Sequence, residues 1–127
     1  MAKVIKIRQN YIPVRFEDDN GELKHELRFY KTDDNIERLT KIGPTIEKLQ
    51  KDIQKNEENG DVTLKQAKKL LKESMNGIFG EGSFEKLYKI NPSVFIIVEY
   101  YILAIGAVVE ELDEIGNTAE LEKYLNG

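Results

Sequence analysis

The chain has 127 residues, of which 40% are hydrophobic, so it has enough apolar material for one core and too little length for two ordinary domains. Its net charge of -4 provides no broad basic surface, which argues against a nucleic-acid-binding protein. The lack of cysteine excludes disulfides, thiolate nucleophiles and zinc-thiolate sites, and the start of the chain lacks the apolar core of a signal peptide, so we expect a cytoplasmic protein.

Residues 1–31 are predicted to form a β-ribbon. Apolar and polar residues alternate on both sides of Asn20-Gly21, a dipeptide typical of two-residue hairpin turns. A turn there sets apolar residues opposite one another on one face and opposite charges on the other, in the pairs Phe16–His25, Val14–Leu27, Ile12–Phe29, Glu17–Lys24 and Arg15–Glu26. Pro13 predicts an edge strand because it cannot donate to a ladder, and residues 3–7 are a candidate third strand.

The ribbon needs support, since two strands alone are marginally stable. We expect the helices or a neighbouring subunit to provide it, and the pattern does not decide whether the hairpin is exchanged between subunits. His25 is the only histidine in the sequence and falls on the apolar phase of its strand. With no second histidine and no cysteine to complete a metal site, we interpret it as a partly covered hairpin side chain.

The apolar period becomes helical at Asp33. Asp33 or Asp34 is the predicted N-cap, with Glu37 completing a capping box after Asp34. A narrow apolar seam follows on an otherwise charged helix, formed by Ile36, Leu39, Ile42, Ile46, Leu49 and Ile53. Gly43-Pro44 interrupts this seam, and because the seam continues in phase we favour a kinked helix over two separate helices.

A second helical stripe follows a predicted polar loop at residues 56–61. The helix restarts at Thr63, with Gln66 completing its cap, and its apolar stripe is formed by Leu64, Ala67, Leu70 or Leu71, Met75 and Ile78. Its outer side carries Lys65, Lys68, Lys69 and Lys72. We interpret these lysines as a solvated face rather than a nucleic-acid site, because the chain is acidic overall.

The sequence FGEGSFEKLY, residues 79–88, predicts a tight glycine turn followed by a short helix. Ser83 is the predicted N-cap of that helix, and the apolar residues on both sides are predicted to fix this corner to the core: Phe79, Phe84, Leu87 and Tyr88. The turn is not a phosphate-binding loop, because it follows a helix rather than a strand and lacks the P-loop lysine.

Residues 94–112, VFIIVEYYILAIGAVVEEL, are predicted to form a long central helix that begins after a Ser93 cap and ends at Gly116. Two adjacent apolar stripes run along it, Phe95, Val98, Ile102, Ile105, Val109 and Leu112 in one, and Val94, Ile97, Tyr101, Ala104 and Val108 in the other. The alternative is a pair of buried strands, since β-branched and aromatic residues are frequent here. The run is too short, and too broken by Glu99, for a membrane span.

Four acidic residues argue against the predicted end of this helix at Gly116. Glu110, Glu111, Asp113 and Glu114 lie just before Gly116, and acids are unfavourable near a helix C-terminus. Beyond it, Asn117 with Glu120 predicts a separate last helix, marked by Leu121, Tyr124 and Leu125.

Together these elements predict one domain over residues 1–127, of the α+β class and mostly α. An N-terminal β-hairpin in residues 1–31 precedes four to five helices in residues 33–127, packed around residues 94–112. The central helix carries more apolar surface than a domain of this size can cover, and we expect the excess to serve an interface.

The motif FGEGSFEKLY, followed by a Pro-Ser break and a long apolar helix, resembles the small tail assembly chaperones of long-tailed (siphovirus-like) bacteriophages and prophages of Gram-positive bacteria. The likeness covers residues 70–114. It implies a protein with no catalytic residues and no cofactor, which works in the cytoplasm of the bacterial host, forms homo-oligomers and coats the tape measure protein before the tail tube polymerises. It also implies a longer form made by ribosomal frameshifting, a feature of the nucleotide sequence.

A tape measure protein is a long helical chain with exposed apolar stripes, so its chaperone needs grooves that accept an amphipathic helix. We expect the seam and the uncovered part of the central helix to provide them, and the predicted partner-binding residues are Ile36, Leu39, Ile46, Leu49, Ile53, Glu99, Tyr100 and Tyr101. The seam has another interpretation, which is packing on the central helix.

Two other classes of protein compete with the chaperone. A structural virion component, such as a head-tail connector or a tail-terminator subunit, also uses a β-ribbon and helices. An enzyme is disfavoured, because the sequence has no cluster of acids at metal or acid/base spacing. We expect neither nucleic acid nor a membrane as a partner.

Overall fold

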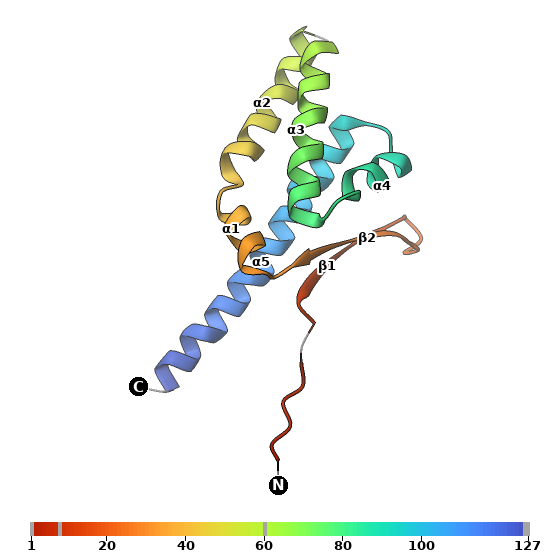
Figure 1. Ribbon diagram of the computed structural model, residues 1–127. Helices are drawn as coiled ribbons and strands as arrows, with labels where there is room; N and C mark the ends of the chain where they lie inside the picture. Colours follow the sequence, from red (N-terminus) through yellow and green to blue (C-terminus); the bar gives the residue numbers. More distant parts are fainter. Residues whose placement is uncertain (1, 8, 60, 126–127) are drawn as a thin grey trace.

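The computed structural model describes the backbone of residues 2–7, 9–59 and 61–125, and the side chains of residues 2–7, 9–54 and 64–113. A hairpin precedes the helices (Figure 1), in the order β1 (Tyr11–Glu17), β2 (Leu23–Tyr30), α1 (Asp33–Thr40), α2 (Gly43–Asn59), α3 (Asp61–Phe79), α4 (Ser83–Ile90) and α5 (Val94–Leu125). The predicted α+β class, mostly α with an N-terminal hairpin, is confirmed.

β1 and β2 pair antiparallel, and their predicted register is confirmed over most of its length. Four of the five predicted pairs are present, namely Ile12–Phe29, Val14–Leu27, Phe16–His25 and Arg15–Glu26. On the outer face, Arg15 Nε and Arg28 Nε both donate to the Glu26 carboxylate, at 3.2 and 2.9 Å. On the inner face Ile12, Leu27 and Phe29 are buried, so the period of two correctly assigns the two faces of the ribbon.

The turn between the strands differs from the predicted two-residue turn. Gly21 N donates to Asp18 O and Asp18 N donates to Glu22 O, both at 2.9 Å, so three residues form the loop. Gly21 has a positive φ of 78°, whereas Asn20 does not, and a two-residue turn of the expected type requires it at both positions. The Asp18 side chain holds the loop, because Asn20 N and Glu22 N both donate to Asp18 Oδ1 at 2.9 Å.

A β-bulge compensates for the longer turn. Glu17 faces Leu23 instead of Lys24, and the register shifts between Phe16 and Glu17, so that Lys24 is the extra residue of β2. The predicted Glu17–Lys24 pair is therefore wrong. Lys24 Nζ instead lies 3.6 Å from Asp18 Oδ2 and 3.4 Å from Glu22 Oε2.

The predicted third strand in residues 3–7 is wrong. These residues run away from the hairpin without regular secondary structure (Figure 1), and Val4, Ile5 and Ile7 are 84, 89 and 98% exposed. A strand folding back onto β1 would have to pass Pro13, which has no N–H group for a ladder.

The predicted kinked helix is two helices, α1 and α2. Ile42 N donates to Leu39 O at 3.2 Å, which closes α1, and α2 begins at Gly43. Pro44 therefore lies in the first turn of α2, where the missing N–H costs nothing because first-turn amides have no helical partner. The N-cap of α1 is Thr32, whose Oγ1 accepts from Asn35 N at 3.2 Å, and not Asp33 or Asp34 as predicted.

The predicted polar loop at residues 56–61 is largely helical. α2 continues to Asn59 and α3 begins at Asp61, ahead of the predicted start at Thr63, while Gly60 lies outside the described residues. Glutamates favour helices almost as much as alanine does, so a polar run that contains Glu57 and Glu58 extends a helix on a solvated side.

α3 and α5 share the core. α3 packs against α1, α2, α4, α5 and β2, whereas α5 packs against α2, α3, α4 and β1. The predicted packing of all helices around residues 94–112 is therefore not confirmed. Both helices bury a stripe at helical spacing, made of Ala67, Leu71, Met75 and Ile78 in α3 and of Val94, Ile97, Tyr101, Ala104 and Val108 in α5.

Residues 94–112 are helical, as predicted, but the helix does not end at Gly116. α5 is one helix from Val94 to Leu125, so the predicted separate last helix after Asn117 is wrong, and its marker side chains lie outside the described ones. The start is as predicted, since Ser93 Oγ accepts from Ile96 N at 3.4 Å. Because α5 continues, Glu110, Glu111 and Asp113 lie within it rather than at its C-terminus.

Candidate functional site

The structure separates the eight predicted partner-binding residues by burial. Leu39, Leu49 and Tyr101 are buried in the core of their own chain, so they offer no surface to a partner in this conformation. Ile46, Ile53 and Tyr100 are partly buried against that core, whereas Ile36 and Glu99 are exposed. The predicted residues therefore do not form one surface.

One groove brings two of the predicted residues together. It lies between α2 and α5, has a volume of about 480 Å³, and is lined by Gln50, Ile53, Gln54, Phe95, Val98, Glu99, Ile102 and Leu103. We call it the α2–α5 groove. Its predicted partner-binding members are Ile53 and Glu99. Phe95, Val98 and Ile102 were predicted only as part of an apolar stripe, and the sequence did not indicate Gln50, Gln54 or Leu103 at all.

The α2–α5 groove follows from helix geometry. Two rows of residues run along one side of α5 at intervals of three or four residues, Phe95–Val98–Ile102 and Phe95–Glu99–Leu103, and together they line that side over two turns. Phe95 is 39% exposed and Leu103 is 64% exposed, so the chain leaves both ends of this side of α5 uncovered, whereas Val98 between them is buried. An apolar floor about two turns long with polar side chains at its rim suits the apolar stripe of another helix.

Among the residues whose side chains are described, Glu99 is the only ionisable one that lines the α2–α5 groove, and it forms no ion pair with another of them. A carboxylate beside an apolar floor favours a basic residue on the partner. The groove therefore has a shape that can accept a helix, and it has an acidic residue, Glu99, at its rim.

A second groove, which sequence analysis did not predict, lies between the hairpin and α5. It has a volume of about 490 Å³, and we call it the hairpin groove; its lining is Val14, Arg15, Phe16, Glu17, Asp18, Lys24, His25, Leu87, Ile90, Tyr100, Leu103 and Ala104. The ring centroids of Phe16 and Tyr100 are 5.3 Å apart, which joins β1 to α5 at its floor. Leu103 lines both grooves and so forms the ridge between them.

His25 lies at the edge of the hairpin groove, partly buried beside Phe16, at 6.3 Å between ring centroids. Burial lowers the pKa of His25, the nearby Lys86 ammonium lowers it further, and Glu26 opposes them. The neutral form is therefore favoured in the folded state.

The pKa of His25 predicts an acid-sensitive contribution to stability. Because the folded-state pKa lies below the ordinary value of 6.5, the unfolded chain binds the proton more readily, and stability rises with pH between the two values. This contribution is complete above pH 6.5 and is lost as the pH falls through the folded pKa. Urea unfolding at pH 7.5 and pH 5.5 should show a larger loss for the wild type than for His25→Gln, and equal losses would contradict it.

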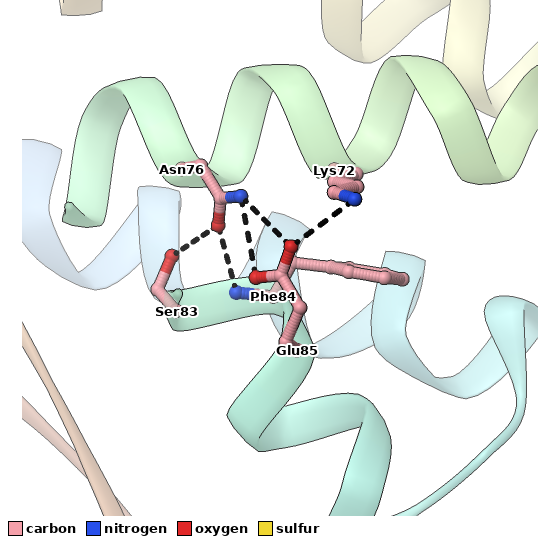
Figure 2. A network of polar contacts seen from close by, with 5 residues as sticks. All are labelled: Lys72, Asn76, Ser83, Phe84 and Glu85. Carbon is pink, nitrogen blue, oxygen red and sulfur yellow. Dashed lines mark hydrogen bonds and ion pairs between the residues drawn. The ribbon is translucent and has the colours of Figure 1, made fainter. Parts of the chain in front are cut away.

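The glycine turn after α3 is held by Asn76. Gly80 and Gly82 have φ of 101° and 86°, and Gly82, the N-cap of α4, has no side chain with which to cap. Figure 2 shows Asn76 of α3 in that role: its Oδ1 accepts from Phe84 N at 3.0 Å and from Ser83 Oγ at 3.2 Å. The predicted Ser83 cap is wrong, because the N-cap is Gly82 and the one hydroxyl hydrogen of Ser83 is shared between Asn76 Oδ1 and Met75 O, which lies 3.1 Å from Ser83 Oγ.

The amide nitrogen of the Asn76 side chain binds the Glu85 carboxylate. Asn76 Nδ2 lies 3.3 Å from both Glu85 oxygens, and Lys72 Nζ lies 3.4 Å from Oε1 (Figure 2). The Glu85 backbone N–H, Asn76 and Lys72 together lower the pKa of Glu85, so it stays ionised at the N-terminus of α4. The predicted anchoring of this corner is confirmed, since Phe79, Phe84 and Leu87 are buried.

The described residues contain neither a cluster of metal-binding side chains nor a membrane-spanning helix. Among them, no three His, Asp or Glu side chains lie close enough to hold a metal ion. No described helix has the length and apolar character that crossing a bilayer requires. The lysines of α3 are exposed, as predicted, and Lys68 Nζ lies 4.4 Å from the centroid of the Tyr88 ring.

Comparison with known proteins does not identify the chain. No protein-family model, curated protein or solved structure matches it.

Proposed function

We propose that this chain is a tail assembly chaperone of a long-tailed bacteriophage or prophage of a Gram-positive bacterium. In this role it is a non-enzymatic protein of the host cytoplasm that associates with itself and binds the tape measure protein during tail assembly. The proposal has two supports: the resemblance carried by FGEGSFEKLY and the helix after it, and the open α2–α5 groove.

The α2–α5 groove is the observation that carries the proposal. An amphipathic helix, such as we expect a tape measure segment to form, repeats its apolar residues every three or four positions, which is also the spacing of Phe95, Val98 and Ile102 along α5. Glu99 pairs with basic residues that flank such a stripe, without requiring one particular sequence. A groove with an apolar floor and an acidic residue at its rim accepts many segments of a long client.

Co-expression with the tape measure protein of the same phage tests this function. We expect the wild-type chain to keep the tape measure protein soluble and to co-purify with it. Glu99→Lys reverses the rim charge at an exposed position, and we expect binding about tenfold weaker, equivalent to 1.4 kcal/mol.

Glu111→Lys is the matched control for Glu99→Lys. It makes the same charge change at an exposed position of the same helix, about 18 Å further along at 1.5 Å per residue. We expect Glu111→Lys to bind as the wild type does. A tape measure protein that stays insoluble with the wild-type chain would overturn the proposed function, and equal losses with both variants would place the client outside the α2–α5 groove.

The alternative class is a structural virion component. The protein composition of the purified virion distinguishes such a component from a chaperone. A chaperone leaves before the tail is complete, whereas a connector or terminator subunit remains in it. Mass spectrometry of purified virions should therefore find the tape measure protein without this chain. Recovery of this chain at the copy number of a structural ring would favour the alternative.

A further inference from the structure

The N-terminal arm, residues 2–7, is exposed and apolar. Val4, Ile5 and Ile7 are between 84 and 98% exposed, and β-branched residues of this kind favour strands. In an extended strand Ile5 and Ile7 share one face, and Lys6 lies on the other. Figure 1 shows the arm leaving β1 and pointing away from the helices, so it is available to another molecule.

β1 offers a free edge to such a strand. At one end of the ribbon Lys31 N donates to Asn10 O at 2.8 Å, and at the other Asp18 N donates to Glu22 O at 2.9 Å. Inward and outward backbone groups alternate along an antiparallel strand, so the odd-numbered residues of β1 direct their N–H and C=O groups away from β2. Pro13 belongs to this set and has no N–H, which leaves Arg15 and Glu17 as the consecutive outward pair.

The hairpin groove runs along this same part of β1. Five consecutive residues, from Val14 to Asp18, line it on one side, and α4 and α5 line it on the other. Ile90 is 51% exposed and Leu103 is 64% exposed at its wall. An added strand at Arg15 and Glu17 would therefore direct alternate side chains against an apolar wall that the chain leaves uncovered.

We propose that the N-terminal arm of one copy adds as a strand to the free edge of β1 in a second copy, with Ile5 and Ile7 in the hairpin groove. The arm departs from the Asn10 end of the ribbon, whereas the groove lies at the Val14–Asp18 end beyond Pro13, so the arm of another molecule fills it. This inference specifies how two copies associate. It rests on the self-association in the proposed function and not on the binding of the tape measure protein.

One position of each surface carries a charge that fits the other. The arm, residues 2–7, contains two basic residues, Lys3 and Lys6, and no acid, although the chain as a whole has a net charge of -4. Glu17 is exposed and forms no ion pair with another described side chain. When Ile5 and Ile7 face the groove, Lys6 lies on the same outer face as the Glu17 side chain. The strand addition therefore pairs Lys6 with Glu17 of the other copy.

Sedimentation velocity over a concentration series of the full-length chain tests the proposal. We expect the wild type to self-associate. The double variant Ile5→Lys, Ile7→Lys should remain monomeric at concentrations about tenfold higher than those at which the wild type associates. Both side chains are at least 89% exposed, so a folding defect is not expected, and urea unfolding of the double variant checks this. Ile90→Lys, on the groove wall, is expected to weaken association in the same way.

A charge exchange tests the pairing itself. Lys6→Glu and Glu17→Lys should each weaken self-association, and the two changes in one chain should restore it. An oligomer that persists in the Ile5→Lys, Ile7→Lys variant would overturn the arm exchange while leaving self-association and client binding intact. A wild-type chain that stays monomeric at all concentrations would overturn both the arm exchange and the self-association in the proposed function, and the tape measure assay would then decide the rest.

Discussion

Tyr101→Ala is expected to lower the free energy of unfolding by about 3–5 kcal/mol, the cost of truncating a fully buried aromatic side chain. Tyr101 has no exposed surface, and its ring lies 6.1 Å from that of Phe79, which lies 6.5 Å from that of Phe29. Both contacts are edge-on, so these three rings join α5, α3 and β2. Urea unfolding followed by circular dichroism measures the loss as a lower midpoint at constant slope.

Tyr101→Phe is the matched control, because it keeps the ring and removes the hydroxyl. That hydroxyl lies 2.6 Å from Ser74 Oγ, and burial raises the pKa of Tyr101 to about 12, so the phenol stays neutral at physiological pH. We expect Tyr101→Phe to cost about 0.5–1.5 kcal/mol, the net value of one hydrogen bond. Similar costs for the alanine and phenylalanine variants would contradict the central packing role of the ring.

The pairing of the hairpin was predictable, and its turn was not. Side chains alternate with a period of two, so moving the register by one residue would expose the whole apolar face of Ile12, Val14 and Phe16. The turn depends on Asp18, whose carboxylate accepts from two loop amides and stabilises a three-residue loop. A bulge at Lys24 then absorbs the extra residue, so the outer pairs keep the register that the apolar pattern predicts.

Helix ends were less predictable than helices, because several residues near an end can fulfil the same role. Thr32 caps α1 although two aspartates follow it, and Pro44 begins a helix instead of bending one. The acids at Glu110 and Glu111 are instructive. Acidic residues are unfavourable near a helix C-terminus, so these two argued against a helix end at Gly116. The structure agrees with them, because α5 continues to Leu125 and they lie away from its C-terminus.

The candidate binding surface was only partly predictable. An apolar stripe indicates that a helix face is covered, but not whether its own chain or a partner covers it. Leu49 and Tyr101 lie in the core, whereas Ile53 and Glu99 line the α2–α5 groove. Leu103 belongs to neither predicted stripe of α5, yet it is the ridge between the two grooves. Its exposure depends on where the hairpin and α2 end, which is a property of the tertiary structure.

Asn76→Ala is expected to destabilise the chain by about 1–3 kcal/mol, more than a typical surface substitution, because it removes the cap of α4. Phe84 N and Ser83 Oγ lose an acceptor, and Glu85 loses a donor. Gly82 cannot replace the lost cap, since it has no side chain. Amide hydrogen exchange should show faster exchange in the first turn of α4, and urea unfolding should show the lower stability.

Two controls separate the cap from the charges around it. Asn76→Asp keeps an acceptor for Phe84 N but places a second carboxylate beside Glu85, so its cost should fall when Glu85→Gln is added. Lys72→Ala removes only an exposed ion pair and should cost less than about 1 kcal/mol. If Asn76→Ala costs no more than Lys72→Ala, the backbone of the glycine turn holds α4 without Asn76. The corner that carries the resemblance to tail chaperones would then be stabilised by Gly80, Gly82 and the buried phenylalanines alone.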